Sequence, residues 1–208
     1  MRAPRGRGRA VSIVFDAAAQ KSGMTKAKLK GIGNAYALGK GDLFPVFFPQ
    51  YIGRWGGTQI LGVIGLYVEP FELWWLDIVS KFKRTNRSGG IIIGIYISNF
   101  RSMMGATAFY VTEQAEIEEW AAKITELARQ IFEPGKDVFD IVCSKQLAGF
   151  GLQTYLGPSV KAYAFKIWLH LQRPDIKLPD LIWLDEERIE SRQQEYDFLR
   201  THYGDIDP

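Results

Sequence analysis

Two glycine-spaced apolar segments dominate the hydrophobic pattern of the chain and predict the middle of a β-sheet. They are residues 60–67 (ILGVIGLY) and residues 91–97 (IIIGIYI). Apolar residues on both faces of a strand indicate that both faces are covered, as in the interior of a sheet. The connection between the two segments is long enough for a parallel crossover, and an antiparallel arrangement is equally compatible with it.

Between these segments, residues 70–82 have the apolar spacing of an amphipathic helix. The apolar positions recur at i, i+3, i+4, i+7 and i+11, and they are Phe71, Trp74, Trp75, Ile78 and Phe82. Such a stripe indicates a helix that packs one face on a core. Pro70 suits the first turn, and Glu69 suits the positive end of the helix dipole.

The remaining pattern of the first half predicts one helix and several shorter strands. We expect a helix at 10–21, strands at 34–38 and 43–48 joined by a turn at 39–42, and a strand at 107–111 that returns as the hairpin partner of 91–97. Pro45 and Pro49 lack the N–H that a sheet ladder needs, so strand 43–48 is expected at a sheet edge or to stop early.

The second half of the chain reads as helical. Residues 113–133 carry the clearest amphipathic pattern, with Thr112 as a cap and Glu133-Pro134-Gly135 as a stop. Further helices are predicted within 136–147, 159–172 and 186–202, the last capped by Asp185 and ended by Gly204.

These elements predict an α+β fold in a single domain. A central mixed or antiparallel sheet would lie in the sheet-rich part, residues 24–112, packed by helices, and residues 113–208 would be helical. Residues 1–9 hold four arginines among Gly and Pro, so we expect them to form a disordered Arg-rich arm able to contact phosphates.

Composition favours a soluble protein with a substantial core. The chain has 208 residues, of which 47% are hydrophobic, and no apolar run approaches the roughly 20 residues needed to cross a bilayer. The first residues lack the apolar region of a usual secretory signal. One cysteine and two histidines exclude a disulfide framework and an ordinary four-ligand Cys/His zinc site. We therefore expect a cytoplasmic protein with no membrane segment, no metal and no cofactor.

Charge is distributed unevenly along the sequence. Residues 1–112 carry 15 Lys and Arg against 5 Asp and Glu, whereas residues 113–208 carry 11 against 18. Such a split is typical of a protein with a basic face for an anionic partner. It is equally typical of a β-rich half with few acids beside solvated acidic helices.

The candidate binding residues are basic or aromatic. On a strand, Lys26, Lys28 and Lys30 would share one face. Arg54 and Trp55 stand with Tyr51 in a predicted Gly-rich loop, where they could stack on a base or anchor the loop. Basic residues at the end of the helix at 70–82 are explained by its dipole, but Arg84 and Arg87 lie beyond the positions that can cap it.

Catalytic motifs are scarce. Neither a phosphate-binding Gly-rich loop nor a Gly-x-Ser-x-Gly elbow is present. Cys143 stands on the apolar side of its predicted helix, where a buried inert thiol is expected. Asp42 and Glu69, with Lys81 and Lys83 near them in sequence, are a loose match to the sets that hold Mg²⁺ against a phosphodiester.

The sequence is most consistent with a non-enzymatic interaction module that uses its basic N-terminal half to bind a nucleic acid or an acidic protein surface. One alternative is an immunity-type or accessory protein whose acidic C-terminal helices neutralise a basic protein partner. Small α+β proteins without a catalytic signature are common among bacterial accessory and immunity-type proteins. A second alternative is a metal-dependent nuclease.

Overall fold

The computed structural model confirms an α+β fold. It describes residues 7–30, 33–54, 57–82, 93–96, 110–111, 114–132, 137–143, 159–179, 183–184, 187 and 189–204. The chain forms two compact units, which we call the sheet unit (Met1–Leu29, Gly33–Tyr67 and Gly94–Pro134) and the helical unit (Lys30–Ile32, Val68–Ile93 and Gly135–Pro208). Folding of both units as one domain stays a prediction.

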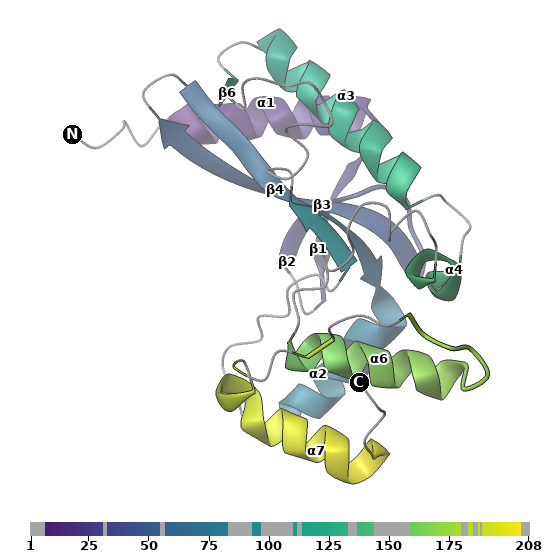
Figure 1. Cartoon of the computed structure of the whole chain (residues 1–208). Helices are drawn as coiled ribbons and strands as arrows, with labels where there is room; N and C mark the ends of the chain where they lie inside the picture. Colours follow the sequence, from purple (N-terminus) through teal and green to yellow (C-terminus); the bar gives the residue numbers. More distant parts are fainter. Residues whose placement is uncertain are drawn as a thin grey trace. The chain divides into compact units, whose positions relative to one another are not determined.

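The sheet has the strand order β1-β2-β3-β4-β5, and a sixth strand, β6, pairs with β4 (Figure 1). The strands are β1 (Thr25–Leu29), β2 (Gly33–Ala37), β3 (Leu43–Arg54), β4 (Gly57–Val68), β5 (Ile93–Tyr96) and β6 (Tyr110–Val111). Pairing is antiparallel between β1 and β2, between β2 and β3, and between β4 and β6.

The interior position predicted for β4 is confirmed, but the prediction for the second apolar segment is not. Among the described strands, β5 stands at the end of the order. The predicted hairpin is also wrong in its partner, because β6 pairs with β4 through Thr58↔Val111 and Gln59↔Tyr110. Apolar content on both faces therefore identified burial but not strand order.

The edge position predicted for β3 is wrong. This strand lies between β2 and β4, although it contains Pro45 and Pro49. Its pairing with β2 is confined to Tyr36↔Phe47 and Ala37↔Val46, so both prolines lie outside the positions paired with β2. The carbonyl of Pro45 still accepts a hydrogen bond from the amide of Leu38 at 2.9 Å. A long interior strand can therefore hold proline where no ladder donor is needed.

The glycine spacing of β4 has a steric reason at Gly62. A Cβ atom at this position would collide with the backbone carbonyl of Phe48 and with the ring of Phe47. Only glycine allows the backbones of β3 and β4 to approach so closely here.

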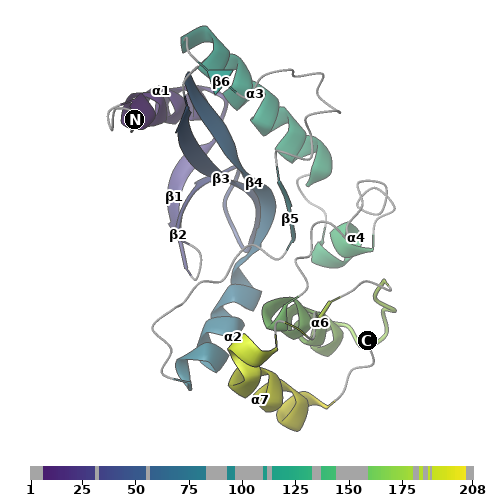
Figure 2. The ribbon, with the colours of Figure 1, turned by 60° about the vertical axis from the view of Figure 1, so that its left-hand side comes forward.

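Two helices pack in the sheet unit, α1 (Arg7–Lys21) and α3 (Gln114–Ile131), and both contact β3 (Figure 2). The core between α1 and the sheet is aromatic: the ring centroid of Phe15 lies 5.2 Å from that of Tyr36 and 5.7 Å from that of Phe47. Because α1 begins at Arg7, the end of the predicted Arg-rich arm belongs to a helix. Because α3 packs in the sheet unit, this unit extends beyond the predicted sheet-rich part of the sequence.

The helical unit contains α2 (Glu69–Ser80), α4 (Val138–Val142), α6 (Val160–Gln172), the short 3-10 helix η4 (Glu190–Arg192) and α7 (Gln193–Tyr203). Phe71 of α2 packs edge-on against Phe165 and Trp168 of α6, at 4.9 and 5.9 Å between centroids. The helix predicted at 186–202 begins as an α-helix only at Gln193, and it ends at Gly204 as expected.

Candidate binding surfaces

The lysine face of β1, formed by Lys26 and Lys28, is the predicted basic feature that the structure describes most fully. Both lysines are exposed, whereas Leu29 at the end of the strand is buried. Alternation along a strand places them on one face, about 7 Å apart. Lys30 lies beyond the end of β1, within the helical unit. Since β1 is first in the strand order, lysines here also discourage edge-to-edge pairing with another chain.

The three lysines differ in their ion pairs. Lys26 Nζ lies 2.9 Å from a carboxylate oxygen of Asp16, which also accepts a hydrogen bond from the Tyr36 hydroxyl. Lys30 Nζ lies 3.7 Å from Glu69. Among the described residues, Lys28 has no acidic group within ion-pair distance. Its ammonium group is therefore the most available of the three to an external anion.

The other predicted binding residues are only partly described. Arg54, like Tyr51, belongs to β3, so the prediction of a loop at these two positions is wrong. Trp55, Arg84 and Arg87 lie outside the described residues.

The candidate metal-dependent site is not assembled within either unit. Asp42 is exposed in the turn between β2 and β3, in the sheet unit, whereas Glu69 begins α2 in the helical unit. Lys81 follows the other end of α2, about 18 Å from Glu69 at 1.5 Å per helical residue. Within the described ranges, no three His, Cys, Asp or Glu side chains are grouped so that they could hold a metal ion.

Cys143 is exposed, so the prediction of a buried thiol is wrong. The helix predicted within 136–147 is present as α4, which ends at Val142, and Cys143 is its C-cap. Partial shielding of the sulfur from water and the negative charge of Asp140 raise the pKa of the thiol. A raised pKa disfavours the reactive thiolate.

The uneven charge of the sequence does not coincide with the two units. The sheet unit carries 12 Lys and Arg against 8 Asp and Glu, and the helical unit carries 14 against 15. The contrast is reduced because acidic α3 belongs to the sheet unit, while α2 and the basic residues after it belong to the helical unit. The charge totals therefore do not single out either unit as a basic surface.

An aromatic cluster with an adjacent cation joins α2 to α7 in the helical unit. We call it the α2–α7 cluster; it comprises Trp74, Lys81, Phe82, Phe198, His202 and Tyr203. The imidazole of His202 is stacked on Phe198, with 3.9 Å between centroids and 25° between planes. Lys81 Nζ lies 4.7 Å from the centroid of the same phenyl ring.

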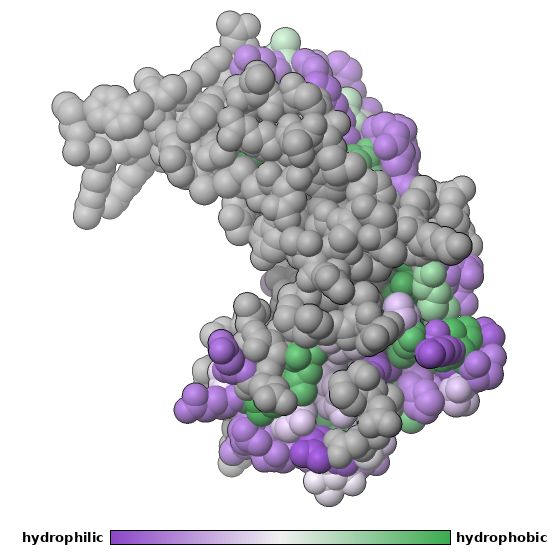
Figure 3. All heavy atoms as spheres, viewed as in Figure 1, coloured by the Kyte–Doolittle hydropathy of each residue, from purple (hydrophilic) through white to green (hydrophobic). Residues whose placement is uncertain are grey.

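The rest of the α2–α7 cluster surrounds that stack. Phe82 meets Phe198 edge-on at 5.8 Å, and Trp74 lies 5.6 Å from Tyr203. Lys81 and His202 are exposed, and the other four side chains are half-buried. The surface over α7 is mostly hydrophilic, whereas hydrophobic side chains reach the surface beside α4 (Figure 3). Sequence analysis found the α2 stripe but not its partner, although the i,i+4 pair of Phe198 and His202 was a usable signal.

A buried ion pair connects α2 to α6. Lys161 Nζ donates to both carboxylate oxygens of Glu72, at 2.6 and 2.7 Å. Burial raises the pKa of Glu72 and lowers that of Lys161, and each partner opposes the shift of the other. Nearby, Arg192 lies 3.5 Å from Glu195 and over the ring of Trp75. These buried charges hold the helices of this unit together and offer no open site.

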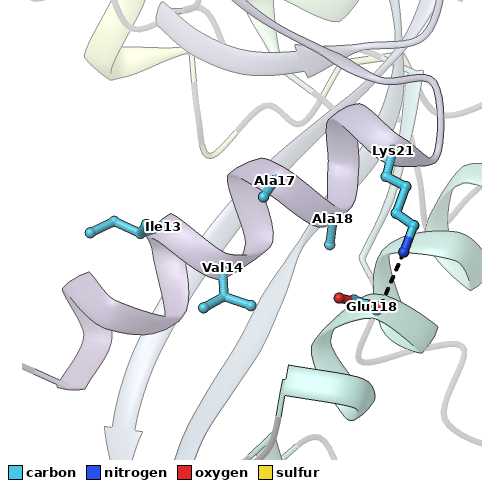
Figure 4. A pocket seen from close by; sticks show the side chains of 6 residues that line it. All are labelled: Ile13, Val14, Ala17, Ala18, Lys21 and Glu118. Carbon is cyan, nitrogen blue, oxygen red and sulfur yellow. Dashed lines mark ion pairs between the residues drawn. The ribbon is translucent and has the colours of Figure 1, made fainter.

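A groove of about 240 Å³ runs between α1 and α3 (Figure 4). An ion pair between Lys21 and Glu118, with 3.5 Å between the charged atoms, forms part of its lining. Its remaining lining is apolar: Ile13, Val14, Ala17 and Ala18. Such a groove offers mainly van der Waals contact, and its two charged groups are paired with each other.

Comparison with known proteins assigns no relative. No protein-family model matches the chain, and no curated protein or solved structure matches it significantly. No helix in the described part of the chain is long and apolar enough to span a membrane. The function must therefore be argued from the surfaces themselves.

Proposed function

We propose that this protein is a non-enzymatic binding module that contacts the phosphate backbone of a nucleic acid through the lysine face of β1. The observation that supports this proposal is the exposed position of Lys28, which has no acidic partner among the described residues, beside Lys26 on the same face. Lysine side chains bind phosphates as point charges without reading sequence.

Two further features support a nucleic acid over an acidic protein as the partner. The sequence begins with Arg2, Arg5, Arg7 and Arg9 among small residues, a composition suited to phosphate contacts. The lysine face itself is flanked by no exposed large hydrophobic side chain of β1 or β2 that could form the core of a protein interface.

The proposal that acidic helices neutralise a basic partner has less support. Helix α3 contains four glutamates. Two of them are in ion pairs: Glu118 pairs with Lys21, and Glu119 pairs with Lys123. Counted over the helical unit, acidic and basic residues are nearly balanced. These ion pairs and the near-balance of charge reduce the support for recognition of a basic partner.

The test is fluorescence anisotropy with labelled single-stranded DNA, duplex DNA and RNA at low salt. We expect the wild-type protein to bind and Lys28→Glu to weaken binding roughly tenfold, since the substitution replaces an attraction by a repulsion. The matched control is Lys177→Glu, which makes the same charge change at an exposed lysine of the helical unit and should bind like the wild type.

Two results would contradict the proposal. One is the absence of nucleic-acid binding at low salt, which would turn attention to a protein partner. The other is equal weakening by Lys28→Glu and Lys177→Glu, which would mean that net charge and not the lysine face decides binding. The same samples incubated with Mg²⁺ or Mn²⁺ test the nuclease alternative, which requires probe cleavage that Glu69→Gln abolishes.

The arginines after α2 are tested separately. If Arg84 and Arg87 also contact phosphates, replacing both by Glu should weaken binding of all three probes. Unchanged binding would exclude these two residues from the nucleic-acid contacts.

A further inference from the structure

We propose that the α2–α7 cluster stacks on an unpaired base, so that the preferred ligand is a single-stranded nucleic acid. This inference rests on the proposed function and names the class of nucleic acid. The imidazole of His202 is the platform for the base, and the ammonium group of Lys81 contacts an adjacent phosphate.

The ring of His202 is held in place by contacts within α7. Phe198 covers one face at 3.9 Å between centroids, the ring of Tyr203 lies 6.5 Å away, and His202 Nδ1 donates to the carbonyl of Phe198 at 2.9 Å. The residue is nevertheless exposed, so part of the ring is accessible to a ligand. A ring that is already fixed loses little conformational entropy when a base stacks on it.

The α2–α7 cluster is more exposed than the aromatic core of the same unit. The neighbouring aromatic core of the helical unit, with Phe71, Trp75, Phe165 and Trp168, is buried, and none of these side chains is more than 8% exposed. The α2–α7 cluster repeats the aromatic content of that core at the surface, where its rings are only half covered. Half-exposed aromatic rings beside a cation are typical of single-strand binding surfaces.

The charges around the cluster are suited to an anionic ligand. The side chain of Lys81 is 48% exposed, and its one acidic contact, Asp77 at 3.5 Å, is itself 73% exposed and therefore weak. Lys83, Arg84 and Arg87 follow Lys81 in the sequence.

A ligand that stacks on the aromatic rings and also pairs with the cations must carry flat rings and negative charges at short intervals. Single-stranded nucleic acid has this combination. In a duplex, each base is already stacked and paired, so a free face is available only after the base is taken out of the helix.

The experiment compares a labelled single strand of about 12 nucleotides, within the usual site size, with its duplex. We expect tighter binding of the single strand by the wild type. His202→Ala should weaken single-strand binding roughly tenfold and leave duplex binding unchanged, and His202→Phe, which keeps a flat ring, should restore it. Gln194→Ala, at an exposed position of the same helix, is the matched control.

The outcomes separate this inference from the proposed function. Equal affinity for single strand and duplex, with His202→Ala binding like the wild type, would overturn the stacking site while leaving the lysine face intact. Failure of His202→Phe to restore binding would overturn the platform role of the ring. Absence of binding by both probes at low salt would contradict the proposed function itself.

Discussion

Lys161 of α6 donates a hydrogen bond to each carboxylate oxygen of Glu72 of α2, and the two form an ion pair in the interior of the helical unit. Their side chains are only 7% and 4% exposed, and the residues are 89 positions apart in the sequence. Two charges at this depth lose most of their hydration, so each depends on the other for compensation.

Removal of one partner should therefore destabilise the protein strongly. We expect Lys161→Met to lower the free energy of unfolding by about 3–5 kcal/mol, because Glu72 would be left buried without a cation. Urea denaturation monitored by tryptophan fluorescence measures this change.

Removal of both partners distinguishes ion pairing from packing. The double variant with Glu72→Leu and Lys161→Met should regain most of the lost stability, since no buried charge remains. Lys123→Ala, which breaks an exposed pair, is the control and should cost no more than about 1 kcal/mol. If the double variant had the same free energy of unfolding as the single variant, the lost stability would come from the packing of the two side chains and not from the unpaired charge.

The close approach of β3 and β4 predicts that Gly62 tolerates no side chain. Gly62→Ala should lower the free energy of unfolding by at least about 2 kcal/mol, because the new methyl group meets the backbone carbonyl of Phe48 and no rotamer change relieves the contact. Ile64→Val, a small change in the same strand, should cost about 1 kcal/mol. Equal costs in chemical denaturation would contradict the approach of the two backbones at Gly62.

The thiol of Cys143 should react slowly at neutral pH despite its exposure. Its pKa is raised above the ordinary value of 9.0, so the thiolate fraction at pH 7 is about 1% or less and grows as the pH rises through that range. Alkylation by iodoacetamide, followed by mass spectrometry, should accelerate about tenfold per pH unit between pH 7 and 9. Asp140→Asn should lower the pKa and accelerate labelling at pH 8; a slower rate would contradict the role of that carboxylate.

Periodicity was a reliable guide to the elements because burial of an apolar face is a local property of the sequence. The stripe from Phe71 to Ile78 and the helix predicted at 159–172 are both present as expected. Periodicity does not specify which elements pack together. The two compact units therefore do not follow the sequence halves, because α2 packs in the helical unit and α3 in the sheet unit. The edge prediction for β3 failed because the positions paired with β2 avoid Pro45 and Pro49.

The candidate surfaces were predictable to different degrees. Alternation on a strand was enough to place Lys26 and Lys28 on one exposed face. The i,i+4 spacing indicates that Phe198 and His202 can meet, but nothing local indicated that this pair would pack against α2, or that Lys161 would meet Glu72. These contacts depend on chain folding over long sequence separations.

The most direct test of the lysine face is the salt dependence of nucleic-acid binding. The logarithm of the association constant for duplex DNA should fall linearly with the logarithm of salt concentration, and Lys28→Ala should reduce the steepness by about 0.9, the contribution of one phosphate contact. A Lys28→Ala slope identical to that of the wild type, with affinity also unchanged, would contradict the proposed role of β1.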